Sequence, residues 1–144
     1  MSDSTTLLSL ESLRKCFGDL EVLRGIDLGV QEQEFVFIIG PSGSGKSTLL
    51  RCCNRLEEPT SGRIVFDGRD ILHKDVNINQ VRQQIGMVFQ SFNLYPHMSA
   101  LGNVSLALKK MMKLNKVRAE QRGMEALEAV GLSDKARAYP NELS

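Results

Sequence analysis

The sequence predicts an α/β fold of the phosphate-loop (P-loop) NTPase type, and three consecutive observations carry that prediction. Residues 35–39 form an apolar run, which is typical of a strand buried on both faces of a parallel sheet. Residues 40–48 are rich in glycine and serine, and they lead into residues 49–56, whose apolar residues predict a helix. A buried strand, a glycine-rich loop and a helix start, in this order, are the context that a phosphate-binding loop requires.

The loop completes the spacing Gly-x-x-x-x-Gly-Lys-Ser at Gly40, Gly45, Lys46 and Ser47. Glycines let the backbone curl around an anion with its N–H groups pointing inward, and the helix adds its positive N-terminal end. Lys46 is expected to reach the β- and γ-phosphates of a nucleotide, and the Ser47 hydroxyl to bind Mg²⁺. The alternative is a glycine-rich turn that carries a lysine by chance, but four specified positions in this context rarely coincide. The sequence therefore predicts a site for a nucleoside triphosphate.

The composition narrows the function classes. At 144 residues the chain is long enough for one domain with one core, and its net charge of +1 gives no basic surface for nucleic acid. We expect no secretory signal and no membrane span, because no apolar run approaches about 20 residues. The three cysteines lack metal-binding spacing and are expected to be small buried groups in a reducing compartment. His73 and His97 are expected to have ordinary surface or packing roles.

On either side of the loop the sequence predicts short elements. Residues 7–16 and 20–30 are expected to form two strands joined by a turn at Gly18-Asp19. The apolar residues of the second strand share one parity and therefore one face: Val22, Ile26, Leu28 and Val30. The helix after the loop is expected to bury Leu49, Leu50, Cys53 and Leu56. There follow a predicted strand at 63–66 with a turn at 67–68, a short helix at 79–84, and a second core strand at 85–89 that ends at Gln90.

After residue 90 the period of the apolar residues changes to a helical one. Ser99 is expected to cap a first helix, whose inward residues are Leu101, Val104, Leu108 and Met111. A second helix is predicted from about Val117 to Val130 and is expected to end at Gly131, with Met124, Leu127 and Val130 facing inward. Ser133-Asp134 is expected to cap one more helical turn.

The number of predicted strands leaves this fold incomplete. Only residues 35–39 and 85–89 are candidates for a central parallel sheet, whereas a P-loop fold needs more strands to cover its core. No apolar strand after residue 90 ends in the Asp or Glu that would help to hold the metal. We therefore expect a domain that is cut short.

Several segments resemble the nucleotide-binding domains of ATP-binding-cassette (ABC) transporters. Beyond the loop, these are Leu20–Leu28, Glu58–Ile64 and Ile85–Gln90. Two further segments, Asn54–Glu57 and Ser91–Met98, are similar in particular to bacterial polar amino-acid importers. The resemblance runs from about Leu8 to Ser144 and implies a single incomplete ABC domain over residues 1–144. Residues 1–98 would form its β-subdomain and P-loop core through the Q-loop, and residues 99–144 its helical subdomain.

The resemblance also implies roles for individual residues. Phe17 falls where the family places an aromatic ring that stacks on adenine, with packing at a strand end as the open alternative. Gln90 matches the Q-loop glutamine, which contacts Mg²⁺ or the attacking water and links the site to the membrane subunit. The predicted nucleotide contacts are Phe17, Val22, Ser42, Gly43, Ser44, Gly45, Lys46, Ser47 and Thr48; the predicted catalytic residues are Lys46 and Gln90, and the predicted metal ligands are Ser47 and Gln90. Gly102 departs from the acidic residue expected in this importer subgroup, which leaves its local role open.

Taken as a whole, the resemblance implies an ATP-binding subunit that uses ATP and Mg²⁺ to drive amino-acid uptake. Such subunits form head-to-tail homodimers and attach to transmembrane permease subunits on the cytoplasmic face of the inner membrane, with no nucleic acid involved. Pro140–Ser144 resembles the lead-in and first two residues of the signature LSGGQ. The rest of that motif, the acidic strand end with its glutamate, the D-loop and the switch histidine are absent from the sequence. We therefore expect this chain to bind ATP but not to hydrolyse it by itself.

Two alternatives stay open. The chain could serve as a non-catalytic nucleotide-binding or subunit-docking module. It could also be a different P-loop enzyme, but the sequence argues against the two obvious kinds. A GTPase needs Asn-Lys-x-Asp, whereas residues 115–118 end in Arg, and DNA-repair relatives of ABC domains insert long coiled coils, whereas no sustained heptads occur here.

Overall fold

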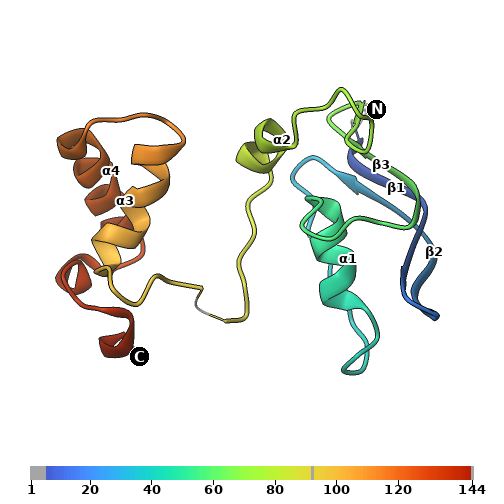
Figure 1. Ribbon diagram of the computed structural model, residues 1–144, viewed down its shortest axis with the longest axis horizontal. Coiled ribbons are helices and arrows are strands. Elements are labelled where there is room, and N and C mark those ends of the chain that lie inside the picture. Colours follow the sequence, from blue (N-terminus) through green and yellow to red (C-terminus); the bar gives the residue numbers. More distant parts are fainter. Residues whose placement is uncertain (1–5, 92, 144) are drawn as a thin grey trace. The chain divides into compact units, whose positions relative to one another are not determined.

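The computed structural model describes residues 6–91 and 93–143 (Figure 1). The chain divides into two compact units, one extending to Met87 and the other beginning at Val88. The first unit contains an antiparallel sheet, the glycine-rich loop and two helices, and the second contains two α-helices and two short 3-10 turns. Each unit is described by itself below. No helix among the described residues is long and apolar enough to cross a membrane.

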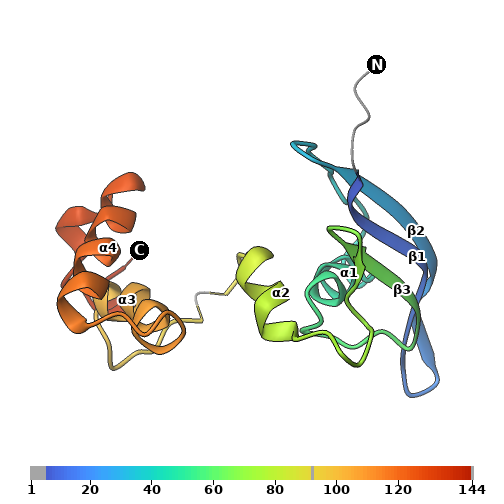
Figure 2. The same cartoon turned by 90° about the horizontal axis from the view of Figure 1, so that it is seen from above.

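The sheet of the first unit has four strands in the order β2-β1-β3-β4, and all neighbours are antiparallel. The strands are β1 (Thr6–Phe17), β2 (Leu20–Gln31), β3 (Ser61–Phe66) and β4 (Arg69–Asp70). The turn between Phe17 and Leu20 confirms the predicted hairpin, and the turn at 67–68 confirms the second one. Figure 2 shows β1, β2 and β3 side by side as a twisted ribbon with α1 to one side of it.

The predicted inward face of β2 is only partly correct. Val22, Ile26 and Leu28 do pack against the core, but the most buried residue of the strand is Leu23, at 3% exposure. The pairing of β1 with β2 shifts register between Leu10 and Leu13 and again at Arg14. Such a shift turns the following side chains to the opposite face, so one parity does not describe the whole strand.

The core of the first unit lies between the sheet and helices α1 (Lys46–Cys53) and α2 (Ile78–Gln84), which confirms the predicted short helix near 79–84. Its buried members are Leu10, Leu13, Leu23, Leu49, Cys52, Ile64, Ile71 and Val81. Of the four residues that the sequence predicted on the inward face of α1, Leu49 is confirmed and Cys53 is half-buried, whereas Leu50 and Leu56 are exposed. Because α1 has only eight residues, its inward face holds one i,i+3 pair, Leu49 and Cys52.

The two predicted core strands at 35–39 and 85–89 are wrong as strands. Neither segment has strand structure, and Phe35, Phe37, Ile39 and Val88 are between 84% and 97% exposed. A strand needs hydrogen bonds from a neighbour. Within residues 6–91 and 93–143, no strand pairs with either segment, so both remain extended chain without a ladder.

The second unit is a helical hairpin of α3 (Ala100–Lys110) and α4 (Lys116–Ala129), followed by η1 (Ser133–Lys135) and η2 (Pro140–Glu142). The Ser99 hydroxyl accepts a hydrogen bond from the Gly102 amide at 3.2 Å, which confirms the predicted cap. The helices pack closely, because a Cβ atom on Gly123 would lie 2.8 Å from Cδ1 of Leu101.

The predicted inward residues of these helices are correct in the middle and wrong at the ends. Leu127 is buried, and Leu101, Val104, Leu108 and Met124 are half-buried. Met111 and Val130 are 55% and 66% exposed. Both follow the last residue of their helix, where the chain departs from the helical face that the spacing assumes. The end of α4 at Gly131 is confirmed, since the Gly131 amide donates to the carbonyl of Glu128 at 2.9 Å.

Candidate nucleotide site

The glycine-rich loop lies between the extended segment after β2 and the first turn of α1. The first backbone bond of the helix runs from the Leu49 amide to the Gly45 carbonyl at 2.8 Å. Gly45 has φ +92°, and a Cβ atom there would lie 2.9 Å from Cγ1 of Val22 and 3.3 Å from its carbonyl oxygen. Only glycine accepts both this left-handed backbone and this closeness to β2. The predicted contact residues Val22 and Gly45 are therefore adjacent in the structure.

The N-terminus of α1 is suited to an anion. The first N–H groups of an α-helix have no partner within the helix, and together they carry a partial positive charge. No side chain caps α1, and its first turn contains no acidic residue. The predicted phosphate contacts Ser42, Gly43, Ser44, Ser47 and Thr48 all belong to this loop and first turn, and none of them is buried. An anion bound here would supply the missing acceptors.

Lys46 lies across the mouth of the loop. Its Nζ donates hydrogen bonds to the carbonyl oxygens of Gly40 at 2.7 Å and Pro41 at 2.6 Å. The ammonium group is thus held within the curve of the loop by two neutral acceptors, which a charged phosphate oxygen would exceed in strength. Beside it is a hollow of about 310 Å³, whose lining includes Ser44, Gly45 and Lys46 together with the apolar residues Val22, Ile26 and Ile39.

Phe17 lies at the end of β1, and the residue is 46% exposed. The β1–β2 register places Cys16 opposite Glu21 and Lys15 opposite Leu23, so Phe17 is at the same end of the hairpin as Val22. Because Val22 contacts the loop at Gly45, the hairpin connects the ring to the phosphate loop. Gln90 belongs to the second unit, where its side chain is exposed. Its role and its metal contact remain predictions.

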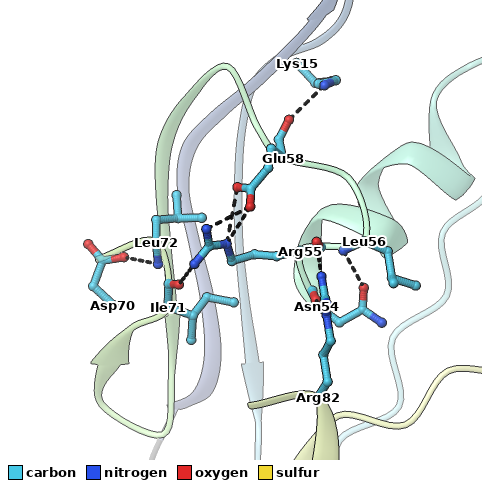
Figure 3. Close-up of polar contacts among 9 residues, drawn as sticks. All are labelled: Lys15, Asn54, Arg55, Leu56, Glu58, Asp70, Ile71, Leu72 and Arg82. Carbon is cyan, nitrogen blue, oxygen red and sulfur yellow. Dashed lines mark hydrogen bonds and ion pairs between the residues drawn. The ribbon is translucent and has the colours of Figure 1, made fainter. Parts of the chain in front are cut away.

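A polar network at the other end of α1 was not predicted from the sequence. Arg82 of α2 donates to the carbonyl oxygens of Asn54 at 3.1 Å and Arg55 at 2.5 Å. Arg55 in turn pairs with Glu58 and donates to the Ile71 carbonyl at 2.7 Å (Figure 3). These donors satisfy carbonyls where the helix ends, and they fix α1 against α2 and the chain that follows β4.

The same network reaches β1 through Lys15. Its Nζ donates to the Glu58 carbonyl at 2.8 Å, as Figure 3 shows, and forms an ion pair with Glu57 at 2.6 Å. The only sequence feature that could have indicated this contact is the acidic pair Glu57-Glu58 after the loop helix. The partners are 43 residues apart along the chain, and nothing local indicates that they meet.

The burial of the cysteines agrees in part with the expectation. Cys52 is fully buried and Cys53 is half-buried with its thiol directed to the Leu49 carbonyl at 3.3 Å. Burial raises the pKa of Cys52 to about 11, with a further contribution from the neighbouring Cys53, and burial raises the pKa of Cys53 to about 11 as well. Cys16 is partly exposed. In the described ranges, no group of three or more His, Cys, Asp or Glu side chains is placed to hold a metal ion.

A phosphate loop between an antiparallel hairpin and a short helix, followed by a separate helical hairpin, defines the chain as an ATP-binding cassette of the P-loop class. Residues 23–144 match the family described as ABC transporter, and the chain belongs to that family. This confirms the fold class and the family that the sequence predicted. The family binds ATP, and its matched segment includes the whole loop.

Curated relatives and solved structures agree with this assignment. The glutamine transport ATP-binding protein GlnQ of Geobacillus stearothermophilus is 49% identical over 96% of this chain and 57% of its own length. GlnQ of Escherichia coli is 47% identical over 96% of this chain and 58% of its length. The chain thus spans somewhat more than half of these relatives. A dimeric ATP-binding cassette, MJ0796, bound to ADP and Pi, superposes with a TM-score of 0.82 at 35% identity, covering 95% of this chain and 63% of that one.

Proposed function

We propose that this chain is the nucleotide-binding part of the ATP-binding subunit of a bacterial amino-acid importer. The observation that carries the proposal is the uncapped, acid-free N-terminus of α1, preceded by a loop that only glycine can close at Gly45. The preference for amino acids rests on the similar relatives, which include proteins described as ATP-binding proteins for glutamine and for general L-amino acid transport.

In this proposal the residues of the loop share the binding of a nucleoside triphosphate. Backbone N–H groups from Ser42 to Thr48 surround the phosphates, and Lys46 exchanges its two carbonyl acceptors for phosphate oxygens. The Ser47 hydroxyl holds Mg²⁺, which neutralises charge on the β- and γ-phosphates when bound. Phe17 offers its exposed ring to the adenine, and Val22 lies beside the loop at Gly45.

Hydrolysis and transport belong to the proposal for the whole protein. Gln90 would contact the metal or the attacking water and pass the state of the site to a permease subunit. Residues 1–98 would act as the nucleotide-binding part of the domain and residues 99–144 as its helical part. Two such subunits would associate as a homodimer, as MJ0796 does, at the cytoplasmic face of the membrane beneath the permease subunits.

A thermal melt of the chain with and without millimolar Mg-ATP tests this proposal. A ligand at 100 times its dissociation constant stabilises a folded protein by about 2.7 kcal/mol, which moves the midpoint of a small domain by many degrees. We expect such a shift for the unmodified chain and its loss in Lys46→Ala. The matched control is Lys74→Ala, because Lys74 is an exposed lysine of the same unit outside the loop. A cooperative melt that does not respond to Mg-ATP would contradict ATP binding and favour a docking module.

A further inference from the structure

Lys15 makes three contacts with a single ammonium group. Its Nζ forms an ion pair with Oε1 of Glu57 at 2.6 Å and donates to the Glu58 carbonyl at 2.8 Å. The same nitrogen lies over the ring of Phe17, 4.6 Å from the ring centroid. The side chain is only 12% exposed, so these contacts are formed largely out of water. A cation over an aromatic face is attracted by the ring quadrupole, more strongly when solvent is excluded.

The segment that contacts Lys15, residues 57–60, is itself hydrogen-bonded to β1. The Thr60 amide donates to the Arg14 carbonyl at 2.8 Å, and the Cys16 amide donates to the Thr60 hydroxyl at 2.9 Å. This segment follows α1, the helix that begins at the phosphate loop. Lys15 therefore joins the exposed ring of Phe17 to the segment that follows the phosphate-loop helix.

We propose that Lys15 is a positioning residue for the purine base of the bound nucleotide. Its ammonium covers one face of the Phe17 ring and fixes the ring relative to α1, which leaves the opposite face for the base. The inference rests on the proposed function, since it requires the triphosphate of the same nucleotide to occupy the loop at Lys46. It adds a residue two positions from Phe17, whose ammonium lies over the ring and which contacts neither base nor phosphate.

Arg14, the basic residue next to Lys15 on β1, has different contacts. Arg14 forms its ion pair with Glu21 at 2.6 Å, within the β1–β2 hairpin, and its side chain is 51% exposed. Its guanidinium group lies near Gly25, with Nη2 3.6 Å from the position of a Cβ atom there. Arg14 thus stabilises the hairpin locally, whereas Lys15 spans from the hairpin to the segment behind α1.

The test compares the affinity of each variant for Mg-ATP with its affinity for magnesium tripolyphosphate, which can occupy only the phosphate loop. The ratio of the two affinities isolates the contribution of the adenosine group and does not depend on the folded fraction of the sample, and a change of this ratio at Phe17 or Lys15 reports on the base that the ring would stack on. In Lys15→Met, a residue of similar length without charge, we expect the ratio to fall about fivefold to tenfold while tripolyphosphate affinity stays within about twofold. Lys15→Arg should restore most of the ratio, and Arg14→Met should leave it unchanged.

Two further variants complete the experiment. Phe17→Ala should remove the preference for ATP, and Lys15→Met should then have no additional effect in that background, because the two act as one unit. Glu57→Gln removes the ion pair of Lys15 without changing the ring and should lower the ratio by a smaller factor. This variant tests the inference if Lys15→Met does not fold. An unchanged ratio in both Lys15→Met and Glu57→Gln would overturn the inference. Failure of the unmodified chain to bind tripolyphosphate would instead overturn the proposed function.

Discussion

Gly62 faces the backbone of Leu13 so closely that a Cβ atom added to it would lie 2.7 Å from the Cα atom of Leu13. The same atom would lie 2.7 Å from the Ser12 carbonyl oxygen, and the backbone of Gly62 has φ +100°. All of these neighbours are backbone atoms of β1, which cannot turn aside as a flexible side chain can. Gly62→Ala should therefore lower the free energy of unfolding by more than about 2 kcal/mol, measured by urea denaturation.

Gly68 provides the matched control for this substitution. It also has a positive φ, +70°, but nothing lies within 4 Å of the added Cβ atom. Gly68→Ala should cost only the backbone strain, about 1 kcal/mol. Equal costs for the two variants would contradict a steric role for the contact between β3 and β1.

Arg82 is expected to stabilise the end of α1. Truncation to Arg82→Met removes the donors to the Asn54 and Arg55 carbonyls while keeping the length of the side chain. We expect the unfolding free energy to fall by about 1 kcal/mol. Gln83→Met on the same helix, at another exposed position, is the control and should change stability by less than about 0.5 kcal/mol. If Arg82→Met and Gln83→Met unfold at the same denaturant concentration, the network does not stabilise the helix end.

The buried cysteines predict a loss of stability at alkaline pH. The pKa of Cys52 and of Cys53 is raised in the folded chain from 9.0 to about 11, so the folded state favours the protonated thiols. Their contribution to stability is complete below about pH 9 and is lost as the pH rises through about 11. We expect each thiol to contribute a fall of about 2 kcal/mol over this range, measured by urea denaturation at fixed ionic strength.

A comparison between variants isolates the contribution of these two thiols. The double variant Cys52→Ala, Cys53→Ala should show a shallower dependence on pH than the unmodified chain, although it is less stable at neutral pH because of the cavity it leaves. Cys16→Ala, at a partly exposed position, should keep the full dependence. The same slope in all three proteins would assign the effect to other groups.

Asn115 is expected to stabilise the second helix of the second unit. Its Oδ1 accepts a hydrogen bond from the Arg118 amide at 2.9 Å, in the first turn of α4. Asn115→Ala should cost about 1 kcal/mol, whereas Asn115→Asp should keep the cap. Helix content measured by circular dichroism during thermal unfolding of both variants is the readout, and identical midpoints for the two would rule out the cap.

Features that depend on neighbouring residues were predictable from the sequence. The hairpin at Gly18-Asp19 and the cap at Ser99 follow from turn and capping residues, and the structure contains both, as it contains the predicted helix near 79–84. The phosphate loop was predictable for the same reason, because its glycines act through the local backbone. The closeness of Gly45 to Val22 explains one of these glycines in a way that spacing alone does not.

Features that depend on distant partners were not predictable. An apolar run such as 35–39 becomes a strand only beside another strand, and the sequence does not say which residues provide it. The parity of β2 failed because register shifts are set jointly with β1. The contacts of Lys15 with Glu57 and of Arg82 with Asn54 connect segments far apart along the chain, and no pattern within either segment indicates them.

The central place of β1 also determines the order in which the first unit can assemble. The pairing of β1 with β2 needs only a two-residue turn. Its pairing with β3 places Leu10 opposite Ile64, and the long chain segment between these residues contains the phosphate loop. Local hairpins form within microseconds, and contacts between residues far apart along the chain form much more slowly. A chain emerging from the ribosome can therefore complete the β1–β2 hairpin before β3 joins the sheet. The sheet is complete only when β3 has paired with β1, with Phe66 opposite Leu8 and Ile64 opposite Leu10.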